Sequence, residues 1–252
     1  MAGHSKWANI KHRKAAVDKK RGKIWSKISR AIIAAARSGG SDPATNLSLR
    51  YAIDEARYAN MPKDTIKRAV DKGAGATGGE NFVPIRYEGY GPAGVAILVD
   101  TLTDNRTRTV SDIRIIFSKT GGNMGNAGCV SYLFETRGQI IVDANKADED
   151  TIMEIVLDAG ADDIESPQDE DDVWTILTGP DAFQQVKDEL EAASIEIASA
   201  ELAMLPANTV EIRGDDARKL MNIVDALEDN DDVQKVYTNA DIPEDELAKL
   251  NG

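Results

Sequence analysis

The sequence predicts an α+β fold: a helical N-terminal domain followed by two ferredoxin-like α+β domains, one of which is inserted into the other. Three observations lead to this expectation. Apolar residues recur at helical spacing as far as Gly73, the glycine-rich stretch 73–79 breaks the pattern, and strand-like alternation mixed with helical segments follows. At 252 residues the chain is long enough for two or three domains.

The N-terminal region predicts three helices. Gly22 marks a break before a helix over 23–37, in which the apolar residues share one face. The segment 38–43 is typical of a helix C-cap, a turn and an N-cap, with a proline as the first residue of the second helix. That helix ends near Asn60, and a short third helix ends at Gly73.

After the linker, the sequence predicts the order β-β-α-β. Strands over 83–90 and 95–102 flank a Gly-Pro-Ala-Gly turn, and Asn105 caps the helix that follows. A glycine loop over 121–128 then leads to a predicted strand over 129–134. This order lacks one helix and one strand of a complete two-layer unit.

The next segment predicts a complete set of six elements. They are a strand at 139–143, a helix at 150–159, strands at 162–165 and 173–177, a helix at 181–193 and a strand at 195–205. This is the ferredoxin-like order β-α-β-β-α-β. The tail adds a helix over 215–228 and a strand over 233–238, the two elements that the first unit lacks. We therefore expect three domains: residues 1–78, a discontinuous domain of 79–130 and 207–252, and an inserted domain of 131–206.

Composition excludes several classes of protein. The sequence holds no apolar run of the roughly 18 residues that a membrane span needs, and its N-terminus lacks the apolar core of a secretion signal. A single cysteine, Cys129, forms no internal disulfide and fits the cytoplasm. With one cysteine and two histidines we expect no zinc site. We also expect no cofactor and no small-molecule substrate.

Charge is distributed very unevenly. The net charge is −13, yet residues 1–72 hold 17 Lys and Arg against 6 Asp and Glu, a local charge of +11. The remaining 180 residues hold 13 basic and 37 acidic groups, a charge of −24. Phosphate backbones bind to local positive potential, and an acidic remainder restricts how they dock. We therefore expect the N-terminal end to bind nucleic acid.

The candidate nucleic-acid-binding residues lie mostly in this basic end. They are Lys6, Trp7, Lys11, His12, Arg13, Lys14, Lys19, Lys20, Arg21, Lys23, Lys27 and Arg30. Basic charge that is spread over a whole segment contacts phosphates, which position a protein on nucleic acid without specifying a sequence. Trp7 is suited either to stacking on an unpaired base or to packing on Trp25.

Two further candidates, Arg106 and Arg108, lie in the first turn of a predicted helix, where cations oppose the helix dipole. With the free amides of that turn they form a candidate phosphate site. The alternative is that Asp104 neutralises them.

Other motifs carry no chemistry of their own. The glycine loop 121–128 follows a helix and enters a strand, the reverse of a dinucleotide fingerprint; it is a connection or a flexible tip that inserts into RNA. The acidic run 169–172 lacks the glycine and distal glutamate of a calcium loop and is interpreted as a solvated hairpin tip. Both histidines lie in the basic arm, so no catalytic set is assembled and we predict that the protein is not an enzyme.

Several motifs resemble those of the YebC family over essentially the whole chain. They are the N-terminal segment from Ala2 to Lys14, Asn60-Met61-Pro62-Lys63-Asp64, Leu102-Thr103-Asp104-Asn105-Arg106, and Gly121 through Gly128. Cys129 departs from the serine that is usual there. The resemblance implies three domains, one helical and two α+β. Bacterial members carry the label of probable DNA-binding transcriptional regulators, some members are described as translation factors acting on ribosomes stalled at proline runs, and a mitochondrial relative activates translation.

Two targets therefore stay open at the level of sequence. Dispersed basic contacts with few specific readers suit ribosomal RNA and a partnership with the ribosome. The family label indicates DNA, for which a compact reading helix is more usual.

Overall fold

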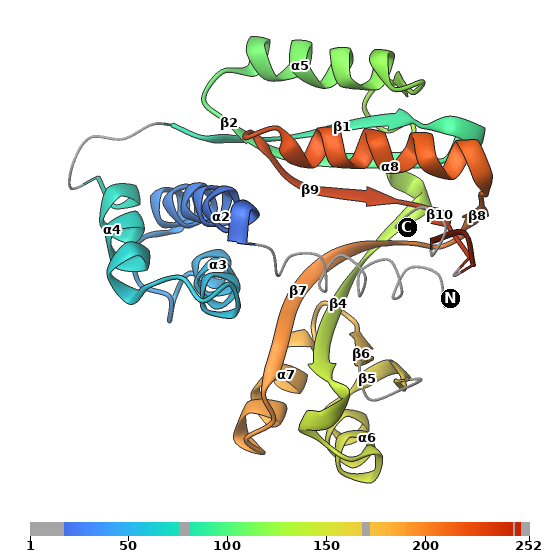
Figure 1. The fold of residues 1–252 in the computed structure, drawn as a ribbon. Helices are drawn as coiled ribbons and strands as arrows, with labels where there is room; N and C mark the ends of the chain where they lie inside the picture. Colours follow the sequence, from blue (N-terminus) through green and yellow to red (C-terminus); the bar gives the residue numbers. More distant parts are fainter. Residues whose placement is uncertain (1–17, 76–80, 168–171, 244, 248–252) are drawn as a thin grey trace. The chain divides into compact units, whose positions relative to one another are not determined.

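The computed structural model describes residues 18–75, 81–167, 172–243 and 245–247 (Figure 1). The chain divides into two compact units. Unit 1 contains the described residues up to Ala52, residues 62–134 and the described residues from Pro206 onward. Unit 2 contains residues 53–61 and 135–205.

Unit 1 begins with helical segments. They are α2 (Asp18–Gly39), the first half of α3 (Leu47–Tyr58) and α4 (Lys63–Gly73). The apolar face of α2 is buried, including Ile28, Ile32 and Ala36, and α2 packs against α4. Gly73 permits this close approach, because a Cβ atom there would lie 2.6 Å from the Ile33 carbonyl oxygen.

Two expected helix boundaries in this region are wrong. The helix α2 begins at Asp18 and continues through Gly22 without a break. The second helix is capped by Asn46, whose side chain accepts a bond from the Leu49 amide at 3.1 Å, and not at residues 41–43. Asp42 instead closes a turn by accepting from the Ala44 amide at 2.9 Å.

The first sheet has the order β3-β1-β2-β9. Its strands are β1 (Val83–Tyr90), β2 (Ala96–Thr103), β3 (Asn123–Met124) and β9 (Val233–Thr238), and a 3-10 turn, η1 (Pro92–Gly94), joins β1 to β2. Helices α5 (Arg106–Lys119) and α8 (Gly214–Asp229) cover one face of this sheet (Figure 1). A buried apolar cluster that includes Val99, Phe117 and Leu227 fills the space between them. The strands β8 (Val210–Glu211) and β10 (Ala240–Asp241) form a separate parallel pair, in which Ala240 belongs to the same apolar cluster and Val210 packs against it.

The expected strand over 129–134 is wrong. The chain there forms a 3-10 turn, η2 (Ser131–Leu133), and the next strand, β4 (Phe134–Asp143), starts only at Phe134. The backbone amides of Gly128, Val130 and Ser131 donate to the Glu88 carboxylate at 2.7, 2.8 and 2.9 Å. These amides are therefore not available to a strand ladder.

Unit 2 has the ferredoxin-like topology, with sheet order β5-β6-β4-β7. After β4 come η3 (Ala144–Lys146), α6 (Glu149–Asp158), β5 (Ala161–Glu165), β6 (Val173–Thr178), α7 (Phe183–Ala192) and β7 (Ile197–Pro206). The predicted α+β class, with a helical N-terminal region and α+β domains, is confirmed. The boundaries of the three expected domains stay a prediction.

Unit 2 also contains the second half of α3, a grouping that the sequence pattern does not suggest. Asp54 of this half forms an ion pair with Lys187 of α7, and the two side chains are 9% and 4% exposed. When both members of an ion pair are buried, removing one of them is strongly unfavourable, because the other is left as an uncompensated buried charge.

Candidate nucleic-acid interface

The three described cations of α2 that were predicted to bind phosphate share one helix face. Lys23, Lys27 and Arg30 are spaced by four and three residues, which brings their side chains into one row. All three contact the segment 228–232, Glu-Asp-Asn-Asp-Asp, where α8 ends and β9 begins. We call this segment the acidic segment. The basic face of α2 therefore lies against an acidic part of its own unit.

Lys23 and Lys27 bind the C-terminal end of α8. The Lys23 ammonium donates to the Asp229 carbonyl at 3.1 Å and also bonds the Asp229 carboxylate. The Lys27 ammonium donates to the Glu228 carbonyl at 2.6 Å. The last carbonyl groups of a helix lack partners within the helix and carry its negative dipole end. Two lysines at this end therefore satisfy both its hydrogen bonds and its charge.

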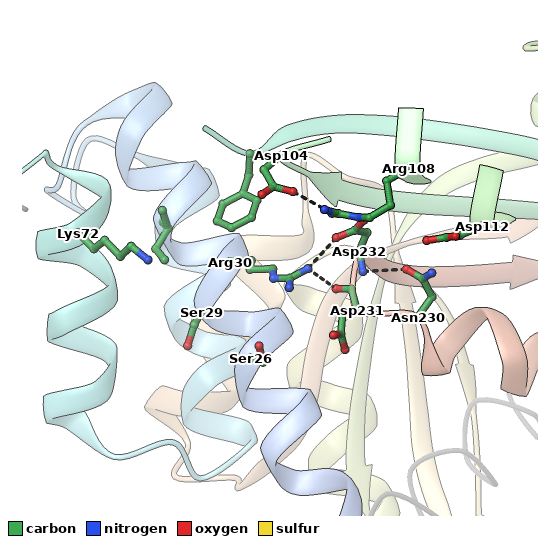
Figure 2. A pocket seen from close by; sticks show the side chains of 12 residues that line it. Ser26, Ser29, Arg30, Lys72, Asp104, Arg108, Asp112, Asn230, Asp231 and Asp232 are labelled. Carbon is green, nitrogen blue, oxygen red and sulfur yellow. Dashed lines mark hydrogen bonds and ion pairs between the residues drawn. The ribbon is translucent and has the colours of Figure 1, made fainter. Parts of the chain in front are cut away.

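Arg30 binds the other end of the acidic segment (Figure 2). Its Nη1 donates to the Asp231 carbonyl at 2.6 Å and to the Asp232 carboxylate at 3.0 Å. The guanidinium also lies 5.5 Å from the centre of the Phe82 ring, a distance at which a cation is attracted by the ring face. The Arg30 side chain is only 23% exposed, compared with 46% for Lys23. The ion pair of Arg30 with Asp232 is therefore more enclosed than that of Lys23 with Asp229.

Asp232 joins α2 to α5. Its carboxylate is 5% exposed and accepts from Arg108 Nη2 at 2.7 Å and from the Thr109 hydroxyl at 2.8 Å, in addition to Arg30. Burial acts to raise the pKa of Asp232, but the bonds from Arg108 and Thr109 and the charges of Arg108 and Arg30 outweigh it, so the pKa lies below its ordinary value. The ionised form is the one this site stabilises.

A cavity of about 600 Å³ opens beside this network (Figure 2). Its charged lining consists of Asp104, Asp112, Asp231 and Asp232 against Arg30, Lys72 and Arg108. Four carboxylates face three cations in this lining, and Arg30 and Arg108 bond to Asp232. Carboxylates therefore outnumber cations in the cavity, and its walls contribute to docking α2 and α5 on the acidic segment.

The structure treats the two arginines at the start of α5 differently. Arg108 bonds to Asp104 at 2.8 Å and to Asp232, and these hydrogen bonds raise the pKa of its guanidinium. This is the neutralised alternative, although Asp232 shares the role with Asp104. Arg106 is exposed, and its phosphate role stays a prediction. Asn105 caps the helix as predicted, accepting from the Arg108 amide at 3.1 Å.

The remaining predicted residues are less fully described. Lys6, Trp7, Lys11, His12, Arg13 and Lys14 lie outside the described residues. Lys19, Lys20 and Arg21 belong to the first turns of α2, where only the backbone is described. The structure thus brings together Lys23, Lys27, Arg30 and Arg108 through the acidic segment, and it leaves the roles of the others as predictions.

The glycine loop is anchored at several points. Asn123–Met124 pairs with the end of β1 as strand β3, and the Gly125 amide donates to the Glu88 carbonyl at 2.8 Å. The Glu88 carboxylate binds three later amides, and these bonds outweigh the effect of burial and keep the pKa of Glu88 below its ordinary value. These contacts favour the interpretation of this loop as a structural connection.

Sequence reasoning missed the acidic segment and Glu88. A signal for the first exists, because 228–232 carries four carboxylates at and just after the end of a helix whose C-terminus would attract cations. No local signal marks Glu88, whose partners follow it by 40 to 43 residues.

The described part of the chain holds neither a clustered metal site nor a helix that could span a membrane. Within these residues no cluster of three or more His, Cys, Asp and Glu side chains has the arrangement of a metal site. No described helix is both long enough and apolar enough to cross a membrane.

The comparisons with known proteins cover nearly the whole chain. A family model described as the TACO1/YebC protein N-terminal domain matches residues 5–76. A second, described as the TACO1/YebC second and third domain, matches residues 82–240. The crystal structure of a conserved hypothetical protein from Aquifex aeolicus aligns with a TM-score of 0.85 at 46% identity, covering 95% of this chain and 98% of that one.

Similar sequences are described alike. A protein of Burkholderia ambifaria is 55% identical over 245 residues, which cover 97% of this chain and 100% of that protein. A protein of Proteus mirabilis is 54% identical over 249 residues, covering 99% and 98%, and one of Desulfatibacillum aliphaticivorans is 49% identical over 249 residues, covering 99% and 100%. Each of the three is described as a probable transcriptional regulatory protein.

Proposed function

Because this chain belongs to the TACO1/YebC family, a non-enzymatic family whose bacterial members are described as probable transcriptional regulatory proteins, we propose that it is a nucleic-acid-binding regulator of gene expression. It acts in the cytoplasm, without a membrane, a cofactor or a small-molecule substrate. The observation that carries the proposal is the charge of +11 on residues 1–72 against −24 on the rest.

Binding is electrostatic and starts from the N-terminal end. Residues 1–37 hold eleven Lys and Arg and a single acid, Asp18. Each phosphate that a cation neutralises releases a counterion, so affinity falls linearly with salt on a log–log scale. The acidic remainder repels the backbone and limits the ways in which the protein docks.

Six cations at this end provide the test. They are Lys11, Arg13, Lys14, Lys19, Lys20 and Arg21. Their replacement by alanine should abolish binding to nucleic acid and leave the folded circular dichroism spectrum intact. With roughly 5–7 phosphates neutralised, the wild-type log–log salt slope should be about −4 to −6.

A matched control removes the same charge elsewhere. It replaces six exposed cations outside the basic end, namely Arg114, Lys119, Lys146, Arg213, Arg218 and Lys219. The control should bind at near wild-type strength. Unchanged binding by the N-terminal variant, or an equal loss in both variants, contradicts the proposal.

DNA is the first candidate target, in keeping with the description of the relatives as transcriptional regulators. One structural observation favours ribosomal RNA as a second candidate. The basic face of α2, the best described candidate for a groove-reading helix, is occupied by the acidic segment. The cations that remain at the N-terminal end are dispersed, which suits irregular RNA better than duplex base edges.

The two targets give opposite results in a pair of measurements. A promoter binder should prefer one duplex over random DNA by roughly a thousandfold or more at physiological salt. A ribosome-associated factor should co-sediment with ribosomes in a salt-sensitive way, and deletion of residues 1–22 should release it. A strong duplex preference without ribosome binding would exclude the RNA candidate.

A further inference from the structure

We propose that the C-terminal end of α8 is an intramolecular competitor of nucleic acid, which holds Lys23 until phosphates displace it. The inference rests on the proposed function and concerns how that same basic surface is regulated. It starts from the contacts of two lysines with Glu228 and Asp229, which are electrostatically similar to contacts with phosphate oxygens.

The groups that hold the lysines resemble a nucleic-acid backbone in charge and in hydrogen bonding. A carboxylate and two carbonyl oxygens at a negative helix end accept from two ammonium groups. A lysine ammonium has three donors on a flexible stem and accepts any anionic oxygen within reach. Phosphate oxygens can therefore replace these acceptors without a change in the fold of α2.

The exposure of each pair decides which contacts can exchange. The side chains of Lys23 and Asp229 are 46% and 76% exposed, so water and salt screen their attraction and little is lost when it breaks. Both partners regain solvent, and Asp229 stays hydrated after Lys23 leaves. This pair is therefore the part of the contact that a phosphate can open.

Arg30 behaves in the opposite way. Its partner Asp232 is 5% exposed, so withdrawal of Arg30 would take one of two arginines from a buried carboxylate. Removing the partner of a buried charge is strongly unfavourable. Arg30 therefore stays in place and keeps α2 docked while Lys23 exchanges partners.

The consequence is a lower affinity for nucleic acid of any sequence. Every phosphate that takes Lys23 must first replace an acceptor already present at high effective concentration. Removal of that acceptor should therefore strengthen binding and add a cation to those that release counterions.

The first test neutralises the competitor in the full-length protein. Asp229→Asn keeps the size of the side chain and removes the carboxylate that holds Lys23. Binding of a fluorescently labelled duplex DNA and of a single-stranded RNA of equal length is measured at several NaCl concentrations. We expect affinity to rise about two- to fivefold, and the slope to steepen by about 0.9 on duplex and about 0.7 on the single strand.

The matched control is Asp158→Asn. Asp158 is exposed and is the last residue of α6, as Asp229 is of α8, so the two variants change net charge and helix-end charge equally. The control should leave the slope unchanged. An equal gain in both variants would show a general effect of net charge and would overturn the competition.

A second test asks whether the gain passes through Lys23. In a Lys23→Met background, Asp229→Asn should no longer raise affinity or steepen the slope, because the cation it would release is gone. A gain that persists there overturns the proposal. A purely structural contact would lower the melting temperature of Asp229→Asn and leave affinity at the level of the control, which also overturns it.

Failure of the competition and failure of the proposed function give different results. If the six-cation N-terminal variant binds as the wild type does, the proposed function fails and the competition fails with it. If that variant loses binding while Asp229→Asn matches Asp158→Asn, the proposed function stands and only the competition is wrong.

Discussion

Replacement of Asp232 by asparagine keeps the shape of the side chain and removes the charge that four other side chains contact, those of Arg30, Thr103, Arg108 and Thr109. The carboxylate accepts from Arg108, Thr109 and Arg30 at 2.7, 2.8 and 3.0 Å and is 5% exposed. An asparagine oxygen that keeps the bonds from Arg108 and Thr109 turns its amide toward Arg30. The Arg30 bond is then lost and the remaining bonds lose their charge.

The expected loss of stability follows from these contacts. Hydrogen bonds to charged groups contribute about 1.5–3 kcal/mol each, and truncating one partner of a buried pair costs about 3–5 kcal/mol. The arginines are 23% and 45% exposed and regain some water, which reduces the loss to about 2–3 kcal/mol. For a chain of this size that corresponds to a melting temperature lower by about 4–12 °C.

The assay is thermal and urea-induced unfolding of Asp232→Asn beside Asp112→Asn. Asp112 lines the same cavity and is half-buried, so it controls for the loss of one carboxylate at this place. We expect Asp112→Asn to change the free energy of unfolding by less than about 0.5 kcal/mol. Equal stability of Asp232→Asn and wild type, or equal losses in both variants, would refute the reasoning.

The same comparison has a predicted dependence on pH. The pKa of Asp232 is lower in the folded protein than its ordinary value of 3.8, so the folded state binds fewer protons there than the unfolded chain. Its contribution to stability is therefore fully present above that ordinary value and is lost as pH falls through the folded pKa. The difference between wild type and Asp232→Asn should stay constant from pH 7 to about pH 5 and shrink below about pH 4.

Three further predictions follow from the fold. Glu88→Gln should lower the free energy of unfolding by about 1–3 kcal/mol in urea titrations, because the new amide faces a backbone N–H; a wild-type midpoint would contradict this. Lys187→Ala should lower the free energy of unfolding by about 3–5 kcal/mol, and the double variant Lys187→Met with Asp54→Leu should recover most of that stability. An equal loss of stability in the double variant would show instead that the ion pair itself is stabilising. Residues 131–206 alone should unfold cooperatively on heating and 79–130 alone should not; cooperative unfolding of the second fragment would argue against a discontinuous domain.

Elements defined by local chemistry could be predicted from the sequence. The β1–β2 hairpin follows from an alternating segment before Gly-Pro-Ala-Gly and an apolar run after it, and Ala93 and Gly94 of the turn have φ values of +53° and +78°. The strand β9 matches its predicted bounds, 233–238, and Asn105 caps α5 through its own side chain. In each case the residues that decide the structure are neighbours in the chain.

Elements decided by distant contacts could not be predicted in this way. The segment 129–134 has the composition of a strand, yet Glu88 binds its amides from forty residues earlier. Gly22 has the low helix propensity of a break, yet α2 continues through it. Propensity is a weak guide where tertiary contacts determine the backbone.

The candidate site shows the same limit for charge. A count of charged residues along the sequence is enough to locate the cations of the N-terminal end. It does not show which cations are free, since Lys23 and Arg30 meet carboxylates that follow them by about two hundred residues.

A local charge of +11 is therefore an upper limit on what nucleic acid can use. The acidic segment neutralises part of the α2 face, and Asp232 holds Arg30 in a partly buried bond that a phosphate cannot replace cheaply. The cations that precede this face in the sequence, among them Lys19, Lys20 and Arg21, stay the predicted phosphate contacts. Each neutralised phosphate contributes about −0.9 to the log–log salt slope on duplex DNA, so a slope that steepens by about this amount in Asp229→Asn would count Lys23 as an addition to these cations.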